Sequence, residues 1–431
     1  MIRSLPRRLL SPRALQVCLG GLLAAGATSL SLQAQSQDPV RLDKLEKENQ
    51  ELKARLDQLE VLARKEGLIP AEPTQSKVVT ALSKITISGF VQASYFYNMQ
   101  DPADDINDGY LWNTSNNSFS LNKFKLTIAS APVEESGEDW GAGFRASMIW
   151  GEDAPVLNTG SSLFGFDGVR EAYVEMNAPI GTGLNIKAGQ LISLLNYESG
   201  DGGAVNANFS QGFQWFYTGN GPSAGAQLGY TVTDWLGVKA RVQNGIYVGP
   251  VDNNDDKTFM GSLNFKPSKD MWVNLIGFTG DETIGATPPQ GLSGGSILAG
   301  YKVLPKLTTG LEFDYFNFDP DNAPSADLWS IGGWIGYDLT SKASLGFRGE
   351  FLSAPDGVGI VGINLPGRPN SAIQSADPDG NIGSLTLTLT YMPLPGLRIQ
   401  PEVRYDFTSY EGGFDGEESR WILGAGVSYL F

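Results

Sequence analysis

The feature that most constrains the fold is a unit repeated through residues 84–431, in which a segment of alternating apolar and polar residues is followed by a connection and another such segment. In the last segment, residues 419–431, every second residue is apolar, as in a strand with one apolar face. If this strand pairs with the first one, the sheet closes and leaves no unsatisfied backbone edge in lipid. The pattern predicts a membrane-spanning β-barrel, with an ordinary sandwich strand as the alternative.

About sixteen antiparallel strands are expected, which makes the fold class an all-β transmembrane barrel with a short N-terminal helical coiled coil. The expected strands are residues 84–98, 117–131, 139–151, 169–178, 183–194, 221–232, 235–247, 258–267, 270–280, 294–303, 306–318, 327–339, 342–354, 381–393, 396–409 and 419–431. The connections between them alternate between short turns and long loops, which is typical of outer-membrane barrels and which a sandwich or propeller does not explain. An even number of strands places both ends of the barrel on the periplasmic side.

Composition excludes several classes of function. A net charge of −16 argues against binding to nucleic acid, which requires a basic surface. The chain has no histidine, so histidine-assisted nucleophilic catalysis and histidine-ligated metals are excluded. Cys18 is its one cysteine and lies in the leader, so a processed chain has no disulfide. We therefore expect no enzyme, no cofactor and no metal site. A carboxylate pair, such as Glu312 and Asp314, or a lysine base is the catalytic alternative that remains.

The N-terminal residues 1–34 have the composition of a secretory signal peptide, with four arginines, then an apolar stretch, then small residues. Cleavage after Ala34 is expected. An uncleaved membrane anchor and lipid attachment at Cys18 are the alternatives. No other segment approaches the roughly 18 continuous apolar residues of a transmembrane helix.

Residues 38–66 lack glycine and repeat apolar residues at spacings of three and four, which predicts a coiled coil. Opposite charges at g and e positions favour parallel chains, in the pairs Arg41–Glu46, Glu48–Lys53 and Arg55–Glu60. We interpret the segment as a periplasmic trimerisation stalk, with a lone amphipathic helix as the alternative. Residues 67–83 form a linker, and residues 84–431 the barrel. The expected coiled-coil core is Leu42, Leu45, Asn49, Leu52, Leu56 and Leu59.

Side chains alternate across a strand, so the apolar face identifies the residues that point into the barrel. Charges on the lipid face near the middle of the membrane cost about 2–4 kcal/mol, which also favours inward placement. The expected basic pore-lining residues are Lys123, Lys125, Arg145, Lys187, Lys239, Arg241, Arg348, Arg398 and Arg404. Charged rows of this kind indicate a water-filled interior.

The barrel segment resembles the outer-membrane porin superfamily, and most closely the OmpL-like putative β-barrel porin family. The resemblance is carried by residues 85–98, 118–128, 169–193 and 251–275. The stalk and barrel together are similar in layout to trimeric substrate-selective porins of Gram-negative bacteria. The resemblance implies passive diffusion of small hydrophilic solutes and a homotrimer in the outer membrane, with the coiled coil in the periplasm. The implied partners are membrane lipid, lipopolysaccharide, small solutes and the barrel-assembly machinery, for which Tyr429 and Phe431 form the terminal signal.

By resemblance and order, the third long connection, residues 195–220, is expected to fold inward and narrow the pore. Its acidic residues, Glu198 and Asp201, would face the basic wall and favour polar solutes, unless they lie on a solvated loop tip. Its aromatic cluster, which includes Trp215, either anchors the loop or stacks against sugars. The sequence thus predicts a porin with a weak preference for anions or polar solutes. A carbohydrate-preferring porin and a structural or adhesive barrel are the alternatives.

Overall fold

The computed structural model describes residues 85–131, 133, 139–154, 168–219, 221–246, 252–283, 289–355 and 379–431. The predicted signal peptide, coiled-coil stalk and linker, residues 1–83, lie outside the described residues. The domain boundaries therefore stay predictions.

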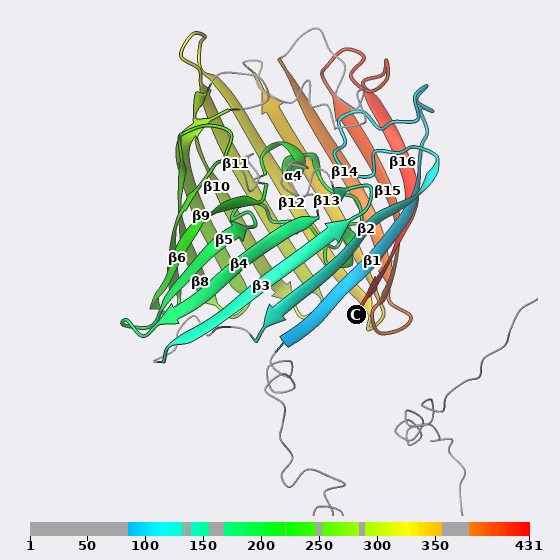
Figure 1. Cartoon of the computed structure of the whole chain (residues 1–431). Helices are drawn as coiled ribbons and strands as arrows, with labels where there is room; N and C mark the ends of the chain where they lie inside the picture. Colours follow the sequence, from blue (N-terminus) through cyan, green and yellow to red (C-terminus); the bar gives the residue numbers. More distant parts are fainter. Residues whose placement is uncertain are drawn as a thin grey trace, which may run out of the picture. The chain divides into compact units, whose positions relative to one another are not determined.

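The described residues form a closed barrel of sixteen antiparallel strands (Figure 1). Each strand pairs with its neighbours in sequence, and β1 pairs with β16 to close the sheet. The strands are β1 (Ile85–Asn98), β2 (Ser118–Ser130), β3 (Gly141–Trp150), β4 (Val169–Ala178), β5 (Leu184–Leu191), β6 (Ser223–Thr233), β7 (Leu236–Gln243), β8 (Thr258–Ser268), β9 (Met271–Glu282), β10 (Gln290–Leu304), β11 (Leu307–Asp319), β12 (Ala326–Thr340), β13 (Ala343–Ala354), β14 (Gly380–Tyr391), β15 (Leu397–Thr408) and β16 (Ser419–Leu430). The sixteen-strand prediction is confirmed, and no predicted boundary differs by more than four residues.

The barrel wall has its apolar face outward, which is the reverse of a soluble sheet. In β14, Leu385 and Leu387 are exposed on the outside, whereas Thr386 and Thr388 are buried on the inside. Such a surface requires an apolar solvent, because large contiguous exposed apolar patches are rare on soluble proteins. Among the described residues, no helix combines the length and the apolarity needed to cross a membrane.

The C-terminal strand closes the sheet as predicted. Tyr429 of β16 lies opposite Val91 of β1 on one side and opposite Leu397 of β15 on the other. Beyond the strand, the backbones of Gly89 and Phe431 exchange two hydrogen bonds of 3.0 Å. Closure therefore satisfies the edge amides that an open terminal strand would expose to lipid.

Within the part of the chain that the structure describes, two long loops fold into the barrel and form its packed interior. Loop 1 (residues 99–117) joins β1 to β2, and loop 3 (residues 192–222) joins β5 to β6. Loop 3 carries the short helices η2 (Gly202–Ala204) and α4 (Phe213–Tyr217); Figure 1 shows α4 inside the ring of strands. Aromatic side chains of both loops belong to the buried apolar cluster of the barrel. These loops determine which part of the interior stays open.

Candidate functional site

Loop 3 crosses the barrel from β5 and docks on the strands near the end of the chain. Helix α4 contacts β12, β13 and β14, and η2 contacts β16 and β1. Buried carboxylates on the wall accept hydrogen bonds from the loop backbone. Glu350 accepts from the N–H groups of Phe213 (2.8 Å) and Gln214 (3.0 Å). Glu402 accepts from Phe209 at 2.7 Å and from Ser210, so these carboxylates satisfy backbone donors that water cannot reach.

Arginines of the same wall donate to loop 3. Arg348 donates to the carbonyl of Ser210 (2.7 Å) and pairs with Glu198 (3.0 Å). Arg404 donates to the carbonyl of Gln211 (2.6 Å). Charge-assisted hydrogen bonds are about twice as strong as neutral ones, so loop 3 is held by strong contacts along its docked length.

Glycines in the wall make room for loop 3. A Cβ atom at Gly310 would overlap the ring of Tyr197, and one at Gly426 would overlap the ring of Phe209. A Cβ atom at Gly346 would lie 2.8 Å from the carbonyl oxygen of Ala207. The wall sequence thus has recesses at the positions that the docked loop occupies.

Loop 1 packs against loop 3. Trp112 is buried against Trp215, with ring centroids 4.5 Å apart. The hydroxyl of Tyr110 donates to Asp406 at 2.8 Å. Asp108 accepts a hydrogen bond from the backbone N–H of Asp415 in the loop between β15 and β16. Burial raises the pKa of Asp108 from 3.8 to about 6, against the opposing effect of the nearby Arg420.

The aromatic residues of loop 3 mostly anchor it. Phe209, Phe213, Phe216 and Tyr217 are buried in the shared cluster, whereas Trp215 is only partly buried. The buried rings cannot stack on a solute. Their position agrees with the anchoring alternative of the two that the sequence left open.

The alternation of side chains across each strand places the nine predicted basic residues inside the barrel. It does not establish that they are in contact with water. Arg348, Arg404 and Lys123 are at most 1% exposed, which corrects the expectation that they line an open pore. Loops 1 and 3 cover them, and carboxylates compensate their charge. Lys123, for example, pairs with Asp153 at 2.8 Å and lies 3.6 Å from the ring centroid of Trp112. Arg241 is also largely buried and donates to Gln227 and to the carbonyl of Ile192.

The other predicted basic residues are more accessible or lie at the edge of loop 3. Arg145 pairs with Glu171 at 2.7 Å and Lys187 with Glu175 at 3.1 Å, and both cations remain partly exposed. Lys239 is partly exposed as well. Lys125 is buried under the tip of loop 3, and Arg398 donates to the carbonyl of Asn206 at 2.7 Å.

The two acidic residues of loop 3 contact their basic partners directly. Lys125 binds both carboxylate oxygens of Asp201, at 2.7 and 2.8 Å. Glu198 accepts from Arg348 and from the indole N–H of Trp334 (3.1 Å). Loop 3 is therefore in direct contact with the wall at these two pairs, and neither acidic residue lies on a solvated loop tip.

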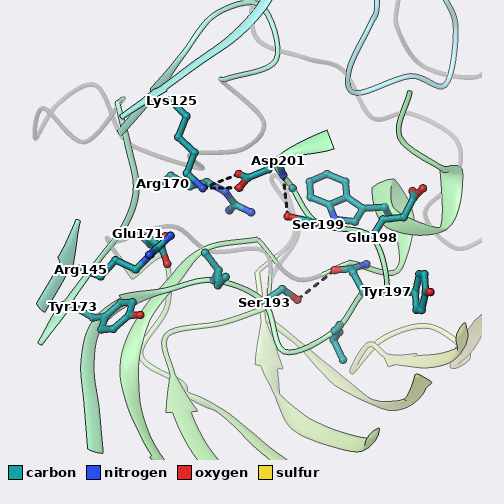
Figure 2. Close-up of a pocket in the computed structure, with 15 residues that line it drawn as sticks. Lys125, Arg145, Arg170, Glu171, Tyr173, Ser193, Tyr197, Glu198, Ser199 and Asp201 are labelled. Atoms are coloured by element: carbon teal, nitrogen blue, oxygen red, sulfur yellow. Dashed lines mark hydrogen bonds and ion pairs between the residues drawn. The ribbon is translucent and has the colours of Figure 1, made fainter. Parts of the chain in front are cut away.

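A cavity of about 440 Å³ remains between loop 3 and strands β2–β4 (Figure 2). Lys125, Arg145, Glu171 and Tyr173 line its wall side, and loop 3 lines the other side from Tyr197 to Asp201. A second cavity of about 310 Å³ lies along β5–β9, near the turn between β6 and β7. Among the described residues, no group of three or more carboxylate or thiol side chains is placed to hold a metal ion.

Three strand residues of the first cavity were missed in the sequence: Arg170, Glu171 and Tyr173. Arg170 and Glu171 are adjacent, yet both are buried. The pairing of β3 with β4 shifts register between Ser147 and Met148, so alternation fails at this point. Tyr173 follows the ordinary alternation. The next residue, Val174, points outward, so Tyr173 points inward, and this pattern would have identified it.

Comparisons with known proteins agree with the barrel. The sequence model of the family described as "Putative beta-barrel porin-2, OmpL-like" matches residues 84–431. Among solved structures, the anion-selective porin from Comamonas acidovorans is similar, with a TM-score of 0.52 at 10% identity, covering 80% of this chain and 99% of that one. The outer membrane channel DcaP of Acinetobacter baumannii has a TM-score of 0.51 at 13% identity, covering 80% of this chain and 97% of that one. A loop-deletion variant of OmpT from Vibrio cholerae has a TM-score of 0.50 at 13% identity, covering 80% of this chain and 99% of that one. The comparison with curated proteins found no match.

Proposed function

The chain belongs to the OmpL-like β-barrel porin-2 family, and from this membership we propose that it is a passive diffusion channel of the bacterial outer membrane, not an enzyme. Small hydrophilic solutes pass through the part of the barrel that loop 3 leaves open. The proposal rests on the uneven filling of the interior.

The interior is packed on one side and open on the other, and this observation carries the proposal. On β13 and β14 the inward side chains, such as Ser384 and Thr386, are buried under loop 3. On β7–β9 the inward Lys239, Asn264 and Asn274 remain partly exposed. The two cavities border the same open side. We call the path along β3–β9 the open lane, and propose that loop 3 narrows it.

The charges beside the open lane support a weak preference for anions or polar solutes. Arg145, Lys187 and Lys239 lie along it, and Arg145 pairs with Glu171 while Lys187 pairs with Glu175. Paired charges of both signs create a strong local field with little net charge, which favours polar solutes and biases ion flow weakly. The net charge of −16 of the whole chain contributes less, because salt screens exposed charges beyond about 8–10 Å.

We propose a homotrimer joined by the stalk at residues 38–66. OmpT of Vibrio cholerae has a trimeric form and supports this assembly by likeness of fold alone. Deletion of residues 38–66 should weaken the oligomer and leave the conductance of each barrel unchanged. Crosslinking that yields only dimers contradicts the trimer, and loss of conductance on deletion contradicts a stalk that only assembles barrels.

Planar-bilayer recording of the purified full-length protein tests the channel. We expect stepwise ion conductance. In a salt gradient we also expect a small reversal potential, with the sign that shows anions to permeate better than cations. A folded barrel that inserts without conducting contradicts the proposal and favours a structural or adhesive barrel. A large reversal potential for cations contradicts the proposed preference.

A further inference from the structure

The second cavity, of about 310 Å³, is chemically different from the first. Its strand side chains include Asn185, Asn264, Asn274 and Trp272, together with Lys239 and Lys266. Among the described residues its one carboxylate is Asp234, from the turn between β6 and β7. Ligand sites have volumes of about 300 Å³ upward, so the cavity suits one small molecule. A lining of amides beside an indole points away from a simple ion site.

Trp272 is held rigidly by a stack of three aromatic rings. Tyr197 of loop 3 lies between Trp272 and Trp334, with ring centroids 5.9 and 4.5 Å apart and interplanar angles of 15° and 24°. A Cβ atom at Gly300 would overlap the indole of Trp272, so the wall leaves a recess for it. Trp272 is partly exposed at the end of this stack and lines the cavity. It therefore presents a fixed apolar surface to the open lane.

Amide groups next to this indole offer both donors and acceptors. Asn264 donates to the side-chain oxygen of Asn274 at 2.9 Å and accepts from Ser262 at 3.1 Å. Among the described residues, the side-chain nitrogen of Asn274 has no hydrogen-bond acceptor. Lys239 lies on the same cavity wall. Hydroxyl groups match amides because each can donate and accept, whereas a carboxylate can only accept.

We propose that this cavity is a binding station for a neutral sugar or similar polyol, with one sugar face stacked on Trp272 and hydroxyls bonded to Asn264, Asn274 and Lys239. The station rests on the proposed channel function, since the solute reaches it through the open lane. The assignment moves carbohydrate recognition from the aromatic cluster of loop 3, which is buried, to a ring on β9.

Two measurements on the full-length protein test the station: block of ion current by maltose, and equilibrium binding of labelled maltose in detergent. We expect maltose to reduce the current beyond a polyethylene glycol of matched hydrodynamic radius, which lacks hydroxyl donors along its chain. Trp272→Leu should raise the half-blocking concentration about tenfold, as loss of one aromatic contact implies. Trp421→Leu is the matched control, because Trp421 is exposed on the outer face of β16.

Trp272 also contacts loop 3, so its replacement could change the block by moving that loop. A second variant separates this indirect effect from the loss of sugar contacts. Asn274→Leu removes hydrogen-bonding groups and leaves the aromatic stack in place, and it should also weaken the block. Equal block by maltose and the polymer, together with no binding, overturns the station while the channel stands. Binding that depends on Trp272 without any conductance supports the station and overturns the channel. Block by citrate but not by maltose overturns the sugar assignment in favour of an anion.

Discussion

Replacing Glu350 with glutamine tests how loop 3 is held in the barrel. Glu350 is buried on β13, and its two oxygens accept hydrogen bonds from the backbone N–H groups of Phe213 and Gln214. Glutamine has one acceptor oxygen, and its amide NH₂ would face the other N–H group. The change keeps the shape of the side chain and removes its charge.

The cost follows from these contacts. A hydrogen bond to a charged group contributes about 1.5–3 kcal/mol, and one of the two is lost while the other becomes neutral. Arg348 and Arg404 also lie 3.7 Å from Glu350 and lose part of their compensating charge. Removing one partner of a buried ion pair costs about 3–5 kcal/mol. Because the change is isosteric, we expect the free energy of unfolding to fall by about 3 kcal/mol.

Two assays test this prediction. Urea unfolding in lipid vesicles should show the loss of stability, and single-channel recording should show greater current noise because α4 leaves the wall more often. Glu418→Gln, the same chemical change at an exposed position of the loop between β15 and β16, is the matched control. Unchanged stability and noise in Glu350→Gln would refute the claim that wall carboxylates hold the loop.

Three further predictions concern charge, packing and pH. Asp201→Asn should move the reversal potential in a salt gradient toward anions and Lys125→Gln toward cations, since each leaves its partner unpaired beside the first cavity; equal reversal potentials would contradict this. Gly310→Ala should lower the stability to urea by about 1–3 kcal/mol because it displaces Tyr197. Gly261→Ala should change it by less than about 0.5 kcal/mol, because a Cβ atom there lies 3.9 Å from its nearest neighbour. Asp108 binds its proton more tightly when folded, with a pKa of about 6 against 3.8, so its contribution to stability falls as pH rises between these values; the melting temperature of Asp108→Asn should lack this decrease.

The strands could be predicted because their pattern is local. Alternation with a period of two identifies a strand and its outward face without reference to distant residues. The segment that ends at Phe431 was placed opposite β1 because an open edge in lipid is unfavourable, and the pairing of Tyr429 with Val91 agrees. Inward placement of Arg348 and Arg404 followed from the same alternation.

The packing of the interior could not be predicted in this way. Arg348 and Arg404 are buried because loops 1 and 3 cover them, through contacts such as Tyr110 with Asp406, which are 296 residues apart in the chain. No periodicity encodes a contact at that separation. Arg170 was missed for another reason, since the register shift beside Met148 interrupts the alternation on which the prediction depended.

Cysteine labelling during current recording tests most directly the claim that one side of the barrel is open and the other packed. The Lys239→Cys variant places a thiol on the open lane, and Thr386→Cys places one beneath loop 3, where the side chain is 1% exposed. A charged, water-soluble methanethiosulfonate reagent should reduce the current stepwise in Lys239→Cys and leave Thr386→Cys unchanged. Reaction at position 386 with block of the current, or no effect at position 239, would contradict the account.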